Sequence, residues 1–469
     1  MNIDFNEDRF FNHNQNIRPI ARELYNGIKN LPIISPHGHV DPKILADNNH
    51  FSNPTNLLLT PDHYIFRMLY SQGIKLEELG IPVIDGSVIE KDPRKIWQIF
   101  CEHYYLFLGT PTSVWLNYVF FEVFELNEVP NQNNALEIFD QIEATLKKEE
   151  FKPREIFDRF NIEVLCTTES ADDSLKYHKK IKDSNWDGKV ITAFRPDAVM
   201  NIAKGGWIKE IKKLSKIAKI EIDSYKRFIE ALEDRRAFFK EMGATSTDQG
   251  IEIPYTGKIS DNKAEEIFQR GLSNKADDND QVIFIGNMLL EMARMSIDDG
   301  LVMQIHTGSF RNHNEYIYKK FGPDKGADIP LRTEYSKNLH SLLNNYGNTT
   351  KLSLIVFTLD ESAYARELAP LAGHYPAMKL GAPWWFNDSI QGMKRFRQSV
   401  TETAGIYNTV GFTDDTRAFL SIPARHDLSR RIDSNFLANQ VAQHIITMNE
   451  AKSISKDLAY NLAKKAYKL

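Results

Sequence analysis

The sequence is poor in cysteine: its 469 residues include only Cys101 and Cys166, which lie far apart and form no CxxC pair. A disulfide scaffold and a thiolate zinc site are therefore excluded. The sequence also lacks a run of about 18 uncharged apolar residues and a basic N-terminal region followed by an apolar stretch. We therefore expect a cytoplasmic protein without a membrane segment.

An excess of positive charge is also missing, since the formal net charge is −5 and the pI is about 6.3. Nucleic-acid binding needs a basic face, so nucleic acid is not an expected partner. No internal repeat, low-complexity tract or Pro/Gly/Ser linker divides the chain. With 42% hydrophobic residues, we expect one domain spanning residues 1–469, with a large core and a small-molecule partner.

Two histidines follow a short apolar run near the N-terminus, in the stretch LPIISPHGHVDP at residues 31–42. Residues 32–37 are predicted to form a buried strand. His37 and His39 are two positions apart, so both imidazoles can point to the same side, which suits a metal ion. The alternative is a pair of loop histidines, one facing solvent and one hydrogen-bonded locally.

Short apolar runs alternate with stretches of helical spacing along the chain. Eight such runs cover residues 32–37, 162–168, 190–195, 243–248, 301–306, 352–358, 378–382 and 408–413. Strands that alternate with helices predict right-handed crossovers and a parallel sheet, and eight units close a (β/α)8 barrel of the TIM type. A doubly wound open sheet is the rival, but the Gly-rich phosphate loop expected after its first strand is missing.

Two further regions have helical spacing throughout. Residues 17–29 place apolar side chains three and four positions apart, which predicts an amphipathic helix. Residues 43–160 show the same spacing without a β pattern, so we expect a large helical insertion after the first strand. Within it, the stretch PDHYIFR places His63 and Arg67 on one helix face, a pattern found more often on a surface than in a site.

In a barrel of this type, catalytic residues lie at the carboxyl ends of the strands. The expected strand ends are rich in polar side chains, among them Thr168, Glu169, Arg195, Asp197, Asp248, Gln249, His306, Asp360, Asp414, Asp415 and Arg417. Together with the two histidines of the first strand, they include ligand types for a divalent metal such as zinc. Arg195 and Arg417 at the same rim suit an anion clamp, which indicates a carboxylated substrate.

These motifs resemble those of uronate isomerase (glucuronate isomerase), a divergent family of the amidohydrolase superfamily of (β/α)8 barrels. The matching stretches follow the family's order along almost the whole chain: PHGHVDP (36–42), DHYIFR (62–67), TTESADDSLKYH (167–178), FRPD (194–197), VMQIHTGSFRNHN (302–314), GPD (322–324), GAPWWFND (381–388) and GFTDDTRAFLSIPARHD (411–427). An HxH pair alone is unspecific, whereas WWFND and the MQIHTGSFRNHN run are specific.

The resemblance implies an aldose–ketose isomerase that interconverts D-glucuronate with D-fructuronate and D-galacturonate with D-tagaturonate. It also implies roles at the matching positions: metal ligands His37, His39 and Asp415; catalytic residues Asp415, Arg417, Tyr64 and His63; substrate-binding residues Arg195, Trp385, Arg425, His306 and Arg311. One departure is Gln249, which stands where the family commonly has a histidine. An amide is a poor zinc ligand, so an altered site is expected if that histidine binds metal or substrate.

The division of labour stays open at this point. Isomerisation moves a proton from C2 to C1 through an enediolate, which requires an acid/base group and a cation beside the developing oxyanion. Asp415, Tyr64 or His63 is the base, and Arg195 or Arg425 holds the C6 carboxylate. A divalent metal, zinc by its ligand types, is expected to bind, but enediolate chemistry need not depend on it.

Two other functions compete with isomerisation. A metal-dependent hydrolase of the same superfamily would use a metal-bound hydroxide. A non-catalytic sugar-acid binding protein would keep the arginine clamps and lose the acid/base groups. We expect the sugar acid to be a substrate, and the protein to form a homo-oligomer.

Overall fold

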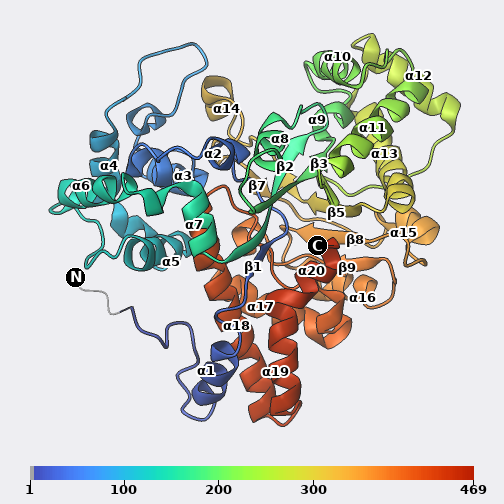
Figure 1. Cartoon of the computed structure of the whole chain (residues 1–469). Coiled ribbons are helices and arrows are strands. Elements are labelled where there is room, and N and C mark those ends of the chain that lie inside the picture. The colour runs from blue at the N-terminus through green and yellow to red at the C-terminus, as the bar shows by residue number, and fades with distance from the viewer. Residues whose placement is uncertain (1–4) are drawn as a thin grey trace.

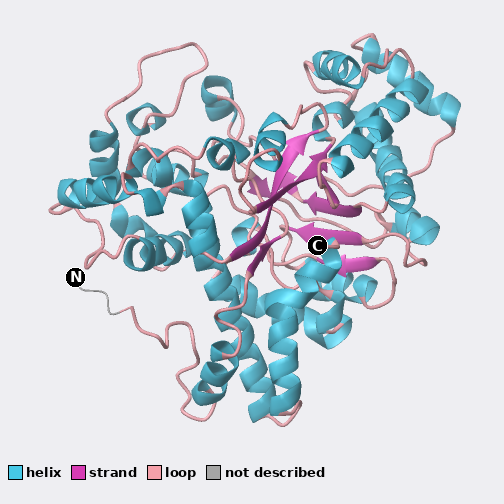
Figure 2. Cartoon of the chain, viewed as in Figure 1, coloured by secondary structure: helices cyan, strands magenta, loops and turns pink. Residues whose placement is uncertain are grey.

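The computed structural model describes residues 5–469. A parallel sheet of seven strands stands at its centre, surrounded by helices (Figure 2). Its strand order is β1-β2-β3-β4-β5-β8-β9, and a separate antiparallel pair is formed by β6 and β7. The strands are β1 (Ile33–Ser35), β2 (Ile162–Ser170), β3 (Lys189–Arg195), β4 (Ser246–Ile251), β5 (Val302–Thr307), β6 (Ser309–Phe310), β7 (Ile329–Pro330), β8 (Leu354–Thr358) and β9 (Met378–Leu380).

The sheet follows the predicted strands up to residue 382. The strand predicted at 408–413 is not formed: only Thr409 pairs with Leu380, in an isolated parallel bridge. Gly411 has a φ of 79°, a left-handed conformation that ends strand pairing there. The fourth strand begins at Ser246 instead of 243, because Gly243, with a φ of 100°, still belongs to the turn after the preceding helix. The fold is therefore α/β, with a curled seven-stranded parallel sheet of the kind found in TIM-type barrels.

Between β1 and β2 the described chain contains helices and no strand, as the apolar spacing predicts. These helices lie together beside the sheet (Figure 1) and share one hydrophobic core with Ile33 of β1 and Leu165 of β2. The helices of this region, called the helical segment below, are α2 (Pro42–Asp47), α3 (His63–Tyr70), α4 (Pro93–Glu102), α5 (Pro111–Tyr118), α6 (Ala135–Leu146) and α7 (Pro153–Arg159).

The helices that follow the strands cover the outer face of the sheet. Strand side chains alternate in direction, and outward-facing residues such as Phe194 and Ile305 join a core with these helices. For example, the rings of Phe194 and Phe239 meet edge to face at 5.1 Å. The helices are α8 (Lys176–Lys182), α9 (Asp197–Met200), α10 (Trp207–Ala218), α11 (Tyr225–Glu241), α12 (Asp261–Leu272), α13 (Asp278–Asp299), α15 (His340–Tyr346), α16 (Ala369–Ala372) and α17 (Ile390–Ala404). Helix α14 (Glu315–Phe321) packs instead on the helical segment, whose core includes Ile317 and Phe321.

The last helices return to the sheet. The predicted N-terminal helix is α1 (Arg18–Asn26), and it packs against α18 (Ile422–Ala442) and α19 (Met448–Lys456) (Figure 1). Helix α20 (Leu462–Tyr467) enters the curl of the sheet, where the Tyr467 hydroxyl donates to Gln304 Oε1 at 2.8 Å. No helix within residues 5–469 is long and apolar enough to span a bilayer.

Candidate active site

A cavity of about 480 Å³ opens at the carboxyl ends of the strands and brings together all the residues predicted to form the site. They come from the loop after β1, from the carboxyl ends of β3 and β5, from the segments after β6 and β9, from the segment before α18 and from helices α3 and α18. The cavity-lining members of the prediction are His37, His39, His63, Tyr64, Arg195, His306, Arg311, Trp385, Asp415, Arg417 and Arg425. The sequence motifs therefore identify one contiguous site.

His37 and His39 converge on Asp415, although both lie beyond the end of β1. Their Nε2 atoms lie 3.6 Å and 3.2 Å from Asp415 Oδ1, and their rings are perpendicular, with centroids 5.3 Å apart. The backbone of this segment is tied to the opposite loop, because His39 N donates to Thr416 O at 2.9 Å. The two imidazoles therefore point to the same place, as predicted, but they are carried by the segment after β1 and not by the strand itself.

His306 belongs to the same centre. Its Nδ1 lies 2.6 Å from Asp248 Oδ1, which orients the ring, and its Nε2 then lies 3.8 Å from Asp415 Oδ2. The ring also stacks on His37 with centroids 4.8 Å apart. Sequence analysis placed His306 among the substrate-binding residues, whereas the structure brings it to the histidine–carboxylate centre.

The donor atoms of this centre fit a divalent metal. His37 Nε2, His306 Nε2 and Asp415 Oδ1 are buried without a hydrogen-bond partner among residues 5–469, an arrangement that costs free energy unless a ligand satisfies them. Two sets, His37–His39–Asp415 and His37–Asp248–His306, each bring their ligand atoms within 4.8 Å of one another. Burial lowers the pKa of His37 to about 4, so its imidazole is neutral at pH 7, the form that binds metal.

Arg195 is held by two carboxylates at the end of β3. Its Nε lies 2.7 Å from Asp197 and its Nη1 lies 3.1 Å from Asp248. The neighbouring strand approaches so closely that a Cβ on Gly250 would lie 2.3 Å from Arg195 Nη2. The glycine is therefore required by the close approach of β4 to the guanidinium.

The other two arginines of the rim have one carboxylate each. The Arg417 side chain is 40% exposed and lies 3.5 Å from Asp324, whereas Arg311 pairs with Asp328 at 2.7 Å. The guanidinium of Arg311 also lies 5.2 Å from the Trp385 ring. Because Asp324, at 3.5 Å, is the one carboxylate within ion-pair distance of its guanidinium among residues 5–469, Arg417 presents the least compensated charge of these side chains.

Helix α3 brings two predicted residues to the cavity from the helical segment. Asp62 caps the helix by accepting from Tyr64 N at 2.8 Å, which places His63 and Tyr64 in the first turn. Burial, reinforced by the positive charge of Arg417, lowers the pKa of His63 to about 3, and burial raises the pKa of the Tyr64 phenol. At pH 7 the imidazole is therefore neutral and the phenol protonated.

Arg67, which shares a helix face with His63 in the sequence, is not a cavity residue. Its guanidinium lies 4.9 Å from the Phe386 ring, and Phe386 in turn stacks on Trp385 with centroids 5.3 Å apart. Helix α3 therefore reaches the cavity at its first turn, with His63, and not at Arg67 one turn later.

The structure adds residues to which sequence analysis gave no role. Asp248, Asp324 and Trp384 line the cavity, and each stands inside a stretch already matched or at an expected strand end. Asn201 and Lys204 line it from the loop after α9, which carries no motif. The first three could have been identified by their position, whereas the last two have no sequence signal.

Gln249 lies on the face of β4 opposite to the site. Its Nε2 donates to Thr247 Oγ1 at 2.9 Å, and it is paired in register with Ile305 on the outer side of β5. Asp248, its neighbour, faces inward and binds His306. The departure at Gln249 therefore does not remove a metal ligand from this site.

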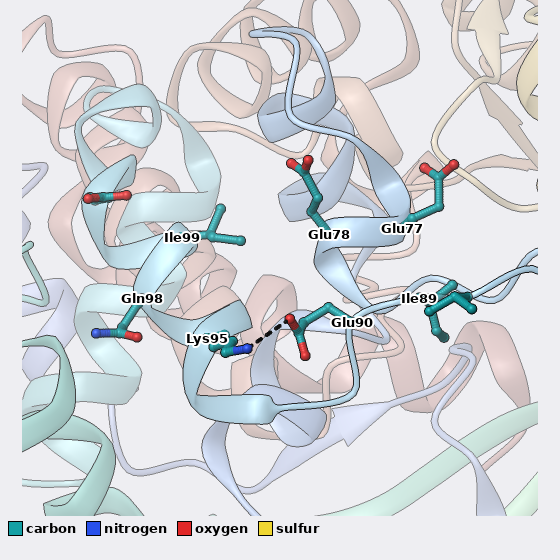
Figure 3. A pocket seen from close by; sticks show the side chains of 9 residues that line it. Glu77, Glu78, Ile89, Glu90, Lys95, Gln98 and Ile99 are labelled. Carbon is teal, nitrogen blue, oxygen red and sulfur yellow. Dashed lines mark ion pairs between the residues drawn. The ribbon is translucent and has the colours of Figure 1, made fainter.

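A second hollow lies on the surface of the helical segment (Figure 3). It measures about 750 Å³ and is lined by four glutamates, three aliphatic side chains, Lys95 and Gln98, with an ion pair of 3.6 Å between Lys95 and Glu90. It contains none of the residues predicted to act in the site. The chemistry of this protein therefore collects in the cavity at the strand ends.

The comparisons with known proteins agree with this geometry. The sequence matches the family described as glucuronate isomerase over residues 3–467. It is 52% identical to a uronate isomerase of Mesorhizobium japonicum over 98% of both chains. The crystal structure of glucuronate isomerase from Caulobacter crescentus superposes with a TM-score of 0.97 at 52% identity, covering 99% of this chain and 97% of that chain. The crystal structure described as that of a putative metal-dependent hydrolase from Lactobacillus casei superposes with a TM-score of 0.55 at 13% identity, covering 95% of this chain and 97% of that chain. This likeness shows the fold alone.

A family match over almost the whole length and relatives at half identity set the chain apart from the hydrolases that share only its fold. The histidines, carboxylates and arginines on which the resemblance was based all line one cavity. The chain belongs to the glucuronate isomerase family.

Proposed function

We propose that this protein is a uronate isomerase that interconverts D-glucuronate with D-fructuronate and D-galacturonate with D-tagaturonate. The observation that best supports this function is the composition of one cavity, which is lined by the carboxylate of Asp415, the phenol of Tyr64 and the cations Arg417 and Arg425. An acid/base pair next to fixed positive charge is what proton transfer through an enediolate requires. Family membership supports the assignment.

Asp415 is the group that we assign to proton removal from C2. Burial alone would raise the pKa of its carboxyl, but the nearby imidazoles of His37 and His39 hold the pKa below its usual range, so the group is ionised at neutral pH. A carboxylate has two oxygens, so Oδ1 can face the histidines while Oδ2 accepts the proton. The same carboxyl then returns the proton to C1, and the proton of the O2 hydroxyl moves to O1, so that C1 carries the hydroxyl and C2 the carbonyl.

Tyr64 and Arg417 stabilise the charge that develops between these two transfers. Because the pKa of Tyr64 is raised by burial, its hydroxyl is protonated and can donate a hydrogen bond to a substrate oxygen. Arg417 is the least compensated cation of the rim and suits the developing oxyanion at O1 and O2. His63 is neutral and buried, which suits a hydrogen-bonding role and disfavours it as the base at C2.

Arg425 is favoured over Arg195 as the partner of the C6 carboxylate. Arg195 is compensated by two carboxylates, Asp197 and Asp248, so that cluster carries a net negative charge. Arg425 is paired with one carboxylate, Asp388. An anionic group of the substrate is therefore attracted more strongly to the Arg425 side of the cavity. Trp385 and Arg311 contribute an aromatic and cationic wall to the same cavity.

A divalent metal would be held by His37, His39 and Asp415, with His306 as a further nitrogen ligand. When bound, such an ion polarises a substrate oxygen and stabilises negative charge on it. Zinc is the metal that three imidazoles and a carboxylate favour. Because Arg417 and Tyr64 also stabilise negative charge, we propose that the metal assists the reaction without being essential.

The whole chain is proposed to form one (β/α)8 barrel domain. The segment 409–414 would take the eighth strand position, since Thr409 bridges to Leu380 and Ser35 Oγ donates to Asp414 Oδ1 at 2.9 Å on the other side. Residues 43–160 would then be an insertion after the first strand. The homo-oligomeric state and the cytoplasmic location stay predictions.

Incubation of the purified protein with D-glucuronate or D-galacturonate in deuterated water tests the function. The expected products are the corresponding keto acids, and recovered aldose should carry deuterium at C2. Lack of turnover with both uronates would contradict the proposal. If substitution of a residue abolishes turnover but leaves the deuterium exchange at C2, that residue is not the base. Single substitutions of Asp415, Tyr64 and His63 therefore show which of the three removes the proton.

No observation favours the hydrolase alternative specifically. The likeness to the Lactobacillus casei structure concerns the fold, and the tip of β4 offers Asp248 where a lysine or a further full ligand set would be expected. A binding protein without catalysis would not need Asp415, His63 and Tyr64 in one cavity.

A further inference from the structure

Arg425 is almost fully buried, with 3% of its surface exposed, and yet it lines the cavity. Its Nε donates to Ser421 Oγ at 3.1 Å. Its Nη1 forms an ion pair with Asp388 and a longer contact of 3.4 Å to Asp414 O. Within the described part of the chain no acceptor is assigned to Nη2. Hydrogen bonds thus fix two edges of the guanidinium and leave the third available to a ligand.

The face of this guanidinium is covered by Trp115 from the helical segment. The Cζ of Arg425 lies 3.4 Å from the centroid of the indole, a stacking contact shielded from water because Trp115 is 3% exposed. The same indole meets the ring of Tyr64 edge to face at 5.6 Å. Trp115 itself does not line the cavity. It therefore contacts two cavity residues, one a cation and one a phenol, from behind.

The indole of Trp115 is held in place by packing. Its Nε1 is buried without a hydrogen-bond partner among residues 5–469, so contacts with neighbouring side chains, and no hydrogen bond, position the indole. Helix α5 begins with a Thr110 cap and Pro111 in its first turn, which fixes the start of the helix that carries the ring. The ring position is thus set by α5, and the plane of the Arg425 guanidinium is set by the ring.

We propose that Trp115 is a positioning residue for Arg425: it fixes the plane of the guanidinium so that Nη2 meets the carboxylate of the sugar acid. This inference rests on the proposed function, in which Arg425 is the carboxylate partner. It assigns to the helical segment a part in substrate recognition besides the contributions of His63 and Tyr64. The hydrogen bonds to Ser421 and Asp388 lie in the plane of the guanidinium, so they still allow the group to tilt out of that plane. A ring stacked on the face of the guanidinium prevents this tilt.

The test compares Trp115→Leu and Trp115→Phe with Trp97→Phe in the full-length, metal-loaded protein. Trp97 is a matched control, because it is also a buried tryptophan of the helical segment but donates to Ala135 O at 2.9 Å and packs only in the core. The loss of a desolvated cation–π contact predicts a KM for D-glucuronate raised about 30-fold in Trp115→Leu and about 3-fold in Trp115→Phe. The kcat should stay within about 3-fold, since the reacting atoms are not touched.

A double-mutant cycle with Arg425→Lys separates positioning from general stability. An ammonium has no plane to fix, so Trp115→Leu should raise KM no further in the Arg425→Lys background. Additive effects would overturn the proposal. The same holds if Trp115→Leu leaves KM unchanged, or if Trp97→Phe raises KM equally. Should Trp115→Leu fail to fold, the proposal is tested with Trp115→Phe and with the double-mutant cycle that combines Trp115→Phe with Arg425→Lys.

Calorimetric binding of D-glucarate distinguishes failure of this inference from failure of the proposed function. D-glucarate is an open-chain sugar diacid without an aldehyde, so its affinity does not depend on turnover. Trp115→Leu should weaken its binding by the same factor as the rise in KM. If the unmodified protein turns over uronates and Trp115→Leu binds D-glucarate normally, the inference is wrong and the function stands. If the unmodified protein binds D-glucarate without turning over uronates, the function is wrong, and the variants still test the inference. Absence of both binding and turnover would overturn both.

Discussion

The cavity has two walls that are built differently. On the wall formed by the strand ends, polar groups hold one another: His306 is fixed by Asp248, and Arg195 by Asp197. On the wall formed by the helical segment, rings hold one another. His63 stacks on Tyr64 with centroids 4.8 Å apart, and Tyr64 meets Trp115 edge to face. The first wall is specified by charge and hydrogen bonds, and the second by shape, so substitutions on them should fail in different ways.

The largest effect is expected from Asp415→Asn on the strand-end wall. The amide keeps the shape but loses the charge that accepts a proton and binds a metal, so kcat should fall about 10³-fold and metal content should fall with it. Steady-state kinetics and elemental analysis measure both. Glu361→Gln, which removes a surface carboxylate paired with Arg395, is the control and should change neither. Full activity of Asp415→Asn would show that the strand-end wall does not supply the acid/base group of the reaction.

Tyr64→Phe on the helical wall should lower kcat about 10²-fold and leave the metal content unchanged. The ring and its packing remain, and only the hydroxyl that donates to the substrate is lost. Tyr118→Phe, which removes the hydroxyl of another half-buried phenol of the helical segment, is the matched control. If Tyr64→Phe also loses metal, the two walls are not independent and the comparison fails.

Removal of the metal by a chelator should have a smaller effect, lowering kcat less than about 10-fold, because Arg417 and Tyr64 still stabilise the developing charge. The melting temperature should fall as well, since His37 Nε2 and His306 Nε2 are left buried without a partner. Activity and metal content are measured on the same samples. A loss as large as that of Asp415→Asn would show that the metal is essential.

Glu169→Gln should leave turnover unchanged and alter only the pH dependence of stability. Glu169 faces the helices, accepts from Thr192 Oγ1 and lies 3.7 Å from His178; Asp41 and Asp173 add negative charge nearby. Burial raises its pKa to about 7, so the folded state binds a proton that the unfolded state has lost. Stability should therefore fall as pH rises through 7, by about 2 kcal/mol between pH 5 and pH 8.

Urea unfolding at a series of pH values measures this effect. The fall with pH should disappear in Glu169→Gln, because the amide does not titrate and can still accept from Thr192. Thr168, the preceding residue, faces the other side of the strand and donates to Gly38 O at 2.9 Å. A change in turnover on Glu169→Gln would break the separation between the two faces of β2.

The strand-end wall was largely predictable from the sequence. His37 and His39 are adjacent in a short motif, and Arg195, His306 and Asp415 follow apolar runs whose alternation identifies strands. The spacing of apolar residues and the position of a residue within a run can be read from a short stretch of sequence. A parallel sheet then brings the carboxyl ends of its strands together at one edge. The direction of a side chain at the edge of a strand was less predictable. Because β4 begins at Ser246, residue 248 faces inward and residue 249 outward, and a shift of one residue would exchange them.

The helical wall was predictable only in part. His63 and Tyr64 belong to a recognisable stretch, but the contact between Trp115 and Arg425 joins positions far apart in sequence through the packing of α5, which no periodic pattern encodes. The strand expected at 408–413 was wrong for a related reason. Its apolar composition suits a strand, whereas Gly411 and the contacts of its neighbours decide that only Thr409 pairs.

The helix α20 has a consequence for biosynthesis. Tyr467 and Ala463 fill the amino-terminal end of the sheet's interior, where the Tyr467 hydroxyl bonds to Gln304 of β5. A ribosome adds residues in order, and strands β1 to β9 emerge long before Tyr467 does. Until then the nascent sheet holds an open apolar interior, a surface that chaperones recognise. Completion of the fold therefore waits until helix α20, which follows all the strands in the chain, has reached its place.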